Sequence, residues 1–134
     1  MRFSIVGCGA LGTILGAHLL GAGHEVNVRV RGIRLKQVET NGLCVSGLKD
    51  FSELGHGSLT INRPVQEDIL VYAVKTYHFE QAFSDVGSSN PLAVFSLANG
   101  VEKTRLLKKL YSESSVLGCM ANFSGELGSD GVAN

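Results

Sequence analysis

The sequence carries little charge of either sign. Its 134 residues include twelve basic and twelve acidic side chains, which give a formal net charge of zero. Proteins that hold nucleic acid or an anionic membrane by bulk electrostatics need an excess of positive charge, so the composition argues against both. The apolar runs are short as well, and Pro91–Leu97 falls far below the roughly 20 residues that a membrane helix needs. We therefore expect no nucleic acid and no membrane among the partners.

Cysteine is scarce and shows no pattern. Cys8, Cys44 and Cys119 are odd in number and have no C-x-x-C spacing, which excludes a disulfide framework or a zinc knuckle and fits a reducing cytosol. The four histidines have no H-x-x-x-H or H-E-x-x-H relation, so we expect no metal site. Met1–Val6 leads straight into a glycine motif with no export signal before it. We expect a cytoplasmic protein.

Apolar residues and glycine are plentiful instead. Hydrophobic residues make up 44% of the chain, and a chain of this size hides about two-thirds of its unfolded surface. One domain, residues 1–134, is therefore expected. Glycine accounts for 17 of the 134 residues, roughly twice its usual share, which indicates that some part of the backbone needs room.

Short apolar runs alternate with segments of helical period. A chain that alternates in this way predicts an α/β fold, a doubly wound, mainly parallel sheet of the Rossmann type. We expect a hairpin of two short strands, Leu43–Val45 and Ser58–Ile61, around Gly55–Gly57, and a polar tail over Gly125–Asn134. His18 lies on the apolar face of the first helix, which favours a core histidine. The main strands are expected at Met1–Val6, Glu25–Val30, Asp68–Val74, Leu92–Leu97 and Ser115–Cys119, and the helices at Leu11–Ala22, Ile33–Thr40, Phe79–Val86 and Val101–Tyr111.

The first turn of the chain has the spacing G-x-G-x-x-G, formed by Gly7, Cys8, Gly9, Ala10, Leu11 and Gly12. It follows a predicted strand and opens a predicted helix, the context in which this pattern binds a dinucleotide. Gly7 then makes the tight turn, Gly9 lets a pyrophosphate approach, and Gly12 lets the helix pack closely. The alternative is a plain strand–helix turn. No Gly-Lys-Ser/Thr follows the loop, which argues against ATP or GTP hydrolysis.

The end of the second predicted strand carries arginine where NAD-binding sites usually carry a carboxylate. Arg31 stands 19 residues after Gly12, and a guanidinium there suits the 2′-phosphate of NADP(H). We therefore expect NADP(H) as the cofactor. Arg34 is expected to be a solvated surface arginine, with a second phosphate contact as the alternative. Cys8 lies beside a helix N-terminus, which would lower the pKa of its thiol, although a small loop residue is the simpler interpretation.

Several motifs, in order, resemble the ketopantoate reductase family, the 2-dehydropantoate 2-reductases of pantothenate synthesis. They are GCGALG, GHEV leading to Arg31-Gly32, Asn41-Gly42-Leu43, Val74-Lys75-Thr76-Tyr77 and Asn99-Gly100-Val101. The resemblance covers essentially the whole chain and implies NADPH-dependent reduction of a 2-keto acid to a 2-hydroxy acid.

The resemblance also assigns roles to single residues. Arg31 matches the arginine that holds the 2′-phosphate, Lys75 matches a lysine beside the cofactor, and Asn99 matches an asparagine near the nicotinamide ribose and the substrate. Both Lys75 and Asn99 follow predicted parallel strands, where ligands of such sheets bind, although a solvated lysine and a turn asparagine remain alternatives. Ala98 and His78 depart from residues that are commoner in the family, which leaves the identity of the keto acid open.

Family members are about twice as long, and the resemblance implies a helical second domain that supplies the proton-donating lysine and is absent from this chain. We therefore assign no catalytic residue within residues 1–134. Three interpretations stay open: part of a ketopantoate reductase, a reductase of another 2-keto acid, and a stand-alone nucleotide-binding or sensing module without catalysis. A homodimer is also left open.

Overall fold

The central feature of the fold is a five-stranded parallel sheet. The structure, a computed structural model, describes residues 1–47, 51–53 and 58–134. The sheet runs in the order β5-β2-β1-β6-β7, and every neighbouring pair is parallel. This confirms the predicted doubly wound fold. Its strands are β1 (Arg2–Val6), β2 (Glu25–Arg29), β5 (Leu59–Ile61), β6 (Ile69–Tyr72) and β7 (Ala93–Ser96).

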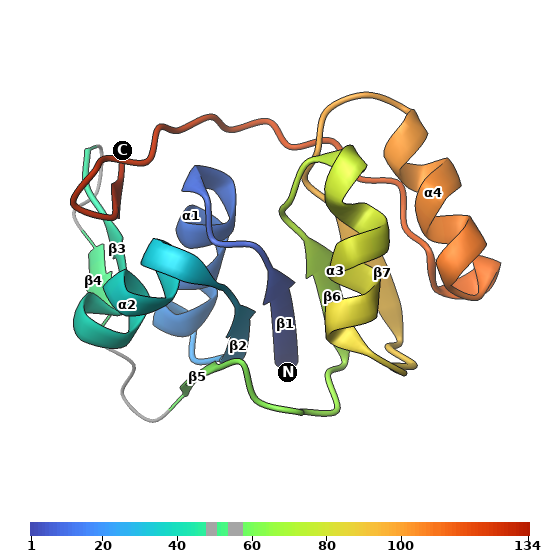
Figure 1. Cartoon of the computed structure of the whole chain (residues 1–134), viewed down its shortest axis with the longest axis horizontal. Helices are drawn as coiled ribbons and strands as arrows, with labels where there is room; N and C mark the ends of the chain where they lie inside the picture. The colour runs from blue at the N-terminus through green and yellow to red at the C-terminus, as the bar shows by residue number, and fades with distance from the viewer. Residues whose placement is uncertain (48–50, 54–57) are drawn as a thin grey trace.

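Helices cover both faces of this sheet (Figure 1). Alternate residues of the strands enter two separate cores: Ile5 and Val71 belong to the core on the side of α1, whereas Val6 and Tyr72 belong to the core under α3 and α4. Strands buried on both faces read as continuous apolar runs, as β6 does. The helices are α1 (Ala10–Gly21), α2 (Gly32–Asn41), α3 (Phe79–Val86) and α4 (Glu102–Leu110), with short 3₁₀ turns at Thr76–His78 and Glu113–Ser115.

The glycine loop lets α1 lie unusually close to the sheet. Gly7 has a φ of +93°, a conformation that other residues rarely adopt, and a Cβ on Gly12 would lie only 2.1 Å from the carbonyl oxygen of Gly7. Both positions therefore require glycine for steric reasons, whatever the loop binds.

A second, smaller sheet packs against α1 and differs from the expectation. It consists of β3 (Leu43–Val45), β4 (Phe51–Glu53) and β8 (Val132–Ala133), with β3 antiparallel to β4 and parallel to β8. The predicted hairpin is wrong, because β5 pairs with β2 in the main sheet; its turn, 55–57, lies outside the described residues. The predicted tail is instead folded back to place β8 beside β3.

Two further local expectations also fail. Residues 115–119 form no strand, and Val116 makes only a single parallel bridge to Val94. His18 is exposed rather than buried, with Nδ1 hydrogen-bonded 2.8 Å from the carbonyl oxygen of Ile14. Its spacing predicts the apolar face of α1, but the buried residues of this helix are Gly12, Thr13, Gly16, Ala17 and Leu20, and His18 lies outside that set.

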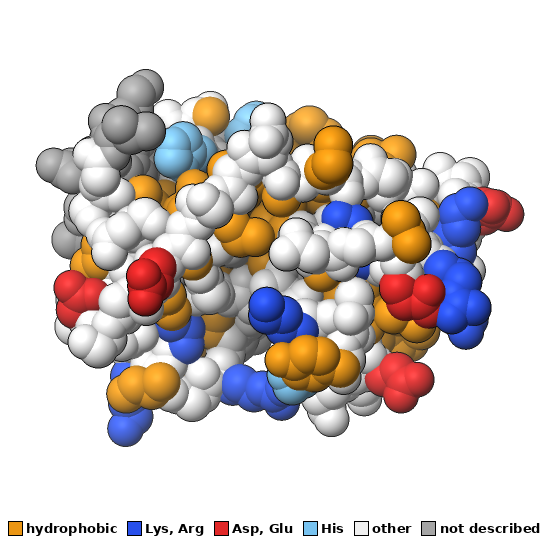
Figure 2. Space-filling view, turned by 90° about the horizontal axis from the view of Figure 1, so that it is seen from above, with side chains coloured by type: hydrophobic (Ala, Val, Ile, Leu, Met, Phe, Trp, Pro, Cys, Tyr) orange, Lys and Arg blue, Asp and Glu red, His pale blue; other side chains and the backbone are white. Residues whose placement is uncertain are grey.

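The carboxyl ends of the strands form one end of the molecule, which Figure 2 views from above. Hydrophobic side chains gather across this face, and Val101, Met120, Leu117 and Phe123 are among the exposed apolar residues of the chain. Within the described part of the chain, no helix is long and apolar enough to span a bilayer.

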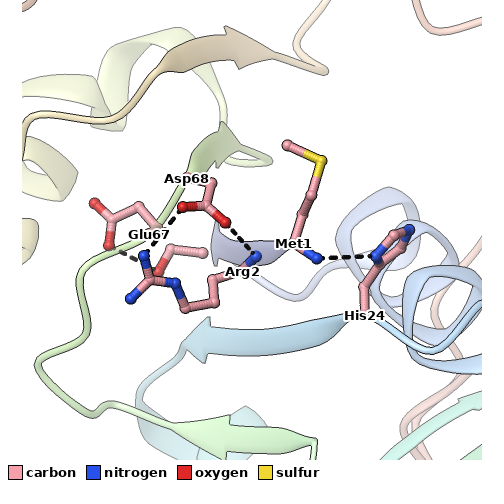
Figure 3. Close-up of polar contacts among 6 residues, drawn as sticks. Met1, Arg2, His24, Glu67 and Asp68 are labelled. Carbon is pink, nitrogen blue, oxygen red and sulfur yellow. Dashed lines mark hydrogen bonds and ion pairs between the residues drawn. The ribbon is translucent and has the colours of Figure 1, made fainter.

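Polar contacts close the opposite, amino end of the sheet (Figure 3). The backbone amide of Arg2 and its guanidinium donate to Asp68 at 2.8 and 3.1 Å, and these hydrogen bonds lower the pKa of that carboxyl. The buried carboxylate of Glu67 accepts hydrogen bonds from Ser4 and Ser89. These contacts connect β1 to the residues just before β6 and close the amino end of the sheet. A ligand site is therefore sought at the carboxyl end, where sheets of this kind bind their ligands.

Candidate functional site

A cavity of about 800 Å³ opens at the carboxyl ends of β1 and β2. This volume lies within the range of about 300–1,000 Å³ typical of small-molecule sites. The glycine loop, the end of β2, the helix α3 and the folded-back tail each contribute to its wall. Sheets of this order bind ligands in the crevice where the strand order reverses, here beside β1. The lining includes Gly7, Cys8, Gly9, Arg31, Arg34, Asp85 and Leu127–Ser129.

The glycine loop presents backbone rather than side chains to this cavity. Gly9 is the N-cap of α1 and makes no side-chain cap, and a Cβ built on it would meet no atom within 4 Å. The first amides of α1 therefore have the free donors and positive helix end that hold phosphates. Ala10, Leu11 and Gly12 form the first turn of that helix. Their contact with a dinucleotide stays a prediction.

The thiol of Cys8 is buried, with 3% of the residue exposed. Burial raises its pKa to about 12, and the guanidinium of Arg34 offsets this only in part. The expectation of a lowered thiol pKa is therefore wrong, because desolvation of the thiolate outweighs the favourable field of the helix end. Cys8 is the small loop residue of the simpler interpretation.

Arg31 is placed where the sequence predicts. It follows β2 as the N-cap of α2, lines the cavity, and keeps 71% of its side chain exposed. Its Nη1 lies 3.8 Å from Oδ2 of Asp85, which comes from the last turn of α3. Sequence reasoning missed Asp85, because 54 positions separate it from Arg31 and no local pattern joins them.

Arg34 is not the solvated side chain that we expect from the sequence. Its guanidinium donates to the carbonyl oxygen of Cys8 at 2.6 Å, to Oγ1 of Thr13 at 2.9 Å, and to the carbonyl oxygen of Gly131 at 3.0 Å. Partial burial lowers the pKa of this arginine. Arg34 thus braces the glycine loop against the tail. The only signal in the sequence is its place one turn after Arg31.

Lys75 and Asn99 lie at the carboxyl ends of β6 and β7 as predicted, but both are exposed and neither lines the cavity. The structure therefore brings the glycine loop and Arg31 together and leaves these two residues at the rim of the same face. Lys103 was missed: only 7% exposed, it donates from Nζ to the carbonyl oxygen of Ala98 at 2.6 Å and supports the turn before Asn99.

The donors around the cavity suit an anionic ligand. The glycine loop and three arginines, Arg29, Arg31 and Arg34, line one space with a single carboxylate among its described lining residues. The buried Nε of Arg29 has no hydrogen-bond partner in the described structure, which indicates that positive charge here is not fully matched by the protein. No group of histidine, cysteine or acidic side chains among the described residues could hold a metal ion.

A family model, curated proteins and solved structures each include relatives of this chain. The family model described as "Ketopantoate reductase PanE/ApbA" matches residues 3–134. A 2-dehydropantoate 2-reductase of Archaeoglobus fulgidus is 34% identical over 126 residues, which is 94% of this chain and 41% of that protein.

Solved structures share the fold. A PanE/ApbA family ketopantoate reductase from Ralstonia eutropha superimposes with a TM-score of 0.85 at 24% identity, over 99% of this chain and 45% of that one. A D-mandelate dehydrogenase, solved with NADH and anilino(oxo)acetate, has a TM-score of 0.81 at 20% identity, over 99% of this chain and 45% of that one. The chain thus spans less than half the length of these relatives.

Proposed function

The chain belongs to the ketopantoate reductase PanE/ApbA family, and from this we propose that it is the NADPH-binding part of an enzyme that reduces 2-dehydropantoate to pantoate. The observation that carries the proposal is the cavity that the glycine loop Gly7–Gly9, at the start of α1, and Arg31 line together. Its lining can bind the two charged groups of NADPH, the pyrophosphate and the 2′-phosphate.

The residues of this chain bind and orient the cofactor. Loop amides at the start of α1 hold the pyrophosphate, and Arg31 pairs with the 2′-phosphate. When bound, NADPH supplies the hydride that reduces the ketone carbon. Lys75 and Asn99, on the rim of the same face, are proposed to contact the nicotinamide end. The proton donor is proposed to lie in the part of the enzyme that this chain does not include.

Calorimetric titration of NADPH and NADH into the protein tests the proposal. We expect NADPH to bind about 10-fold more tightly, which is about 1.4 kcal/mol; the exposure of Arg31 limits the preference. Arg31→Ala should remove this preference and leave the affinity for NADH nearly unchanged. Arg31→Asp should reverse it, because a carboxylate repels the phosphate and accepts from the ribose hydroxyls.

Lys36→Ala is the matched control, since it removes an exposed positive charge from the same helix α2 without touching the cavity. Equal affinity for both nucleotides in the unmutated protein, or equal weakening of both by Arg31→Ala, contradicts the assignment of Arg31. Binding of neither nucleotide contradicts the proposed function itself.

A second candidate substrate is another 2-keto acid. Ala98, half-buried at the end of β7 next to Asn99, stands where the family often carries a polar residue. Assays of the complete enzyme with 2-dehydropantoate and with aromatic 2-keto acids distinguish the two candidates. Absence of turnover with every keto acid, together with retained NADPH binding, would instead support a sensing module.

A further inference from the structure

The cavity contains a carboxylate that the end of β2 lacks. Among the described residues that line it, Asp85 is the only acidic one. NAD-specific sites carry their carboxylate at the end of the second strand, where it accepts from the ribose hydroxyls. Here that position carries Arg31, and the carboxylate arrives from α3, on the other face of the sheet.

Three contacts fix where this carboxylate lies. Gln81, one turn earlier on α3, donates from Nε2 to Oδ1 of Asp85 at 3.0 Å, and Arg29 donates from Nη1 to the backbone carbonyl of Asp85 at 3.4 Å. The remaining oxygen, Oδ2, lies 3.8 Å from Nη1 of Arg31. The two side chains thus approach each other from opposite walls of the cavity.

We propose that Asp85 is a specificity-determining residue: it competes with the 2′-phosphate for Arg31 and so limits the preference for phosphorylated dinucleotides. The inference rests on the proposed function, since it assumes that a dinucleotide occupies this cavity. A 2′-phosphate must draw Arg31 away from Asp85 and then lies close to a carboxylate of the same sign. A dinucleotide without this phosphate leaves the ion pair of Arg31 and Asp85 intact. It also places no phosphate charge beside the carboxylate of Asp85.

Neutralising Asp85 should therefore favour one nucleotide selectively. We expect Asp85→Asn to tighten the binding of NADP⁺ about 3- to 10-fold, which is about 0.7–1.4 kcal/mol, and to change the affinity for NAD⁺ less than about 2-fold. The gain should shrink at high salt, because the Debye length falls from ~10 Å at 0.1 M to ~3 Å at 1 M.

The experiment is calorimetric titration of NADP⁺ and NAD⁺ into the purified protein and its variants at low and high salt. Asparagine has the size of aspartate and still accepts from Gln81, so α3 should keep its structure, which circular dichroism checks. Asp85→Ser is a second variant that also removes the charge. Glu80→Gln is the matched control, since Glu80 is an exposed carboxylate in the first turn of the same helix.

The expected result is a higher ratio of NADP⁺ to NAD⁺ affinity in both Asp85 variants and an unchanged ratio in Glu80→Gln. An unchanged ratio in the Asp85 variants overturns the inference and leaves the proposed function standing. The same gain in Glu80→Gln also overturns it, because net charge rather than Asp85 would then set the preference. Failure of the unmutated protein to bind either nucleotide overturns the proposed function and this inference with it.

Discussion

At the scale of single residues, two arginines of the candidate site have different surroundings and different roles. Arg31 is exposed at the mouth of the cavity, whereas Arg34 is bound on three sides by protein oxygens. They lie three positions apart at the start of α2, and only their surroundings separate the guanidinium that we propose to bind a phosphate from the structural one. Arginine serves both purposes because its five donors are fixed in a plane.

Arg34→Ala is expected to destabilise the protein by about 2–4 kcal/mol, because it removes four hydrogen bonds and leaves the carbonyl oxygen of Cys8 without this donor. It should also weaken NADPH and NADH alike, since the loop that holds the pyrophosphate loses its brace. Urea unfolding and calorimetry measure the two effects, with Lys36→Ala as the control. A loss confined to NADPH would show that Arg34 is a phosphate ligand instead.

The residue scale also shows the limits of sequence reasoning. The position of Arg31 could be predicted, because it depends on local sequence, the end of a strand after a glycine loop. The burial of Arg34 could not be predicted, because its partner Gly131 lies 97 positions away. Asp85 was missed for the same reason: long-range pairing decides which side chains share a cavity.

At the scale of elements, period and glycine spacing predict β1, α1 and the loop between them well, because all three are fixed by neighbours in sequence. The pairing of short strands was not predictable. Leu59–Ile61 has the composition of a strand, but nothing local shows that it pairs with β2 rather than with Leu43–Val45. In the same way, Val132–Ala133 becomes a strand only because β3 offers it an edge.

The contact between β1 and the chain before β6 should make stability depend on pH. Because the pKa of Asp68 is lowered in the folded state by hydrogen bonds from Arg2, its contribution is fully present above the unfolded pKa of about 3.9. It is lost as the pH falls through the lower folded pKa. Asp68→Asn should therefore be less stable than the unmutated protein at pH 7, and the difference should fade toward pH 2.

Urea unfolding from pH 7 downward measures this difference, with Asp130→Asn, an exposed aspartate in the tail, as the control. A difference that is constant with pH would show that the contact with Arg2 does not depend on the charge of Asp68.

At the scale of the whole molecule, the carboxyl end of the sheet carries both the candidate site and an apolar surface. Val101 and Met120 are 91% and 88% exposed there, and exposed apolar patches commonly mark interfaces. Since the chain spans less than half the length of its relatives, we propose that this protein self-associates through the face when nothing else covers it.

Sedimentation equilibrium over a wide concentration range is expected to show dimers or larger species. Met120→Ser combined with Val101→Ser should shift the equilibrium toward monomer, whereas Leu92→Ser, exposed just before β7 at the opposite, amino end of the sheet, should shift it less. A strictly monomeric protein up to millimolar concentration would contradict the expectation.

The folded-back tail also has a consequence for the order in which the protein matures. The parallel sheet is complete once residue 96 has formed its strand, but Leu127–Ser129 and the carbonyl of Gly131, which complete the cavity wall and its brace, come about thirty residues later. During synthesis from the N-terminus, a nascent chain can thus contain the complete main sheet while the wall of the cavity is still incomplete. We therefore expect dinucleotide binding to require residues 127–131, and not only the core of the main sheet.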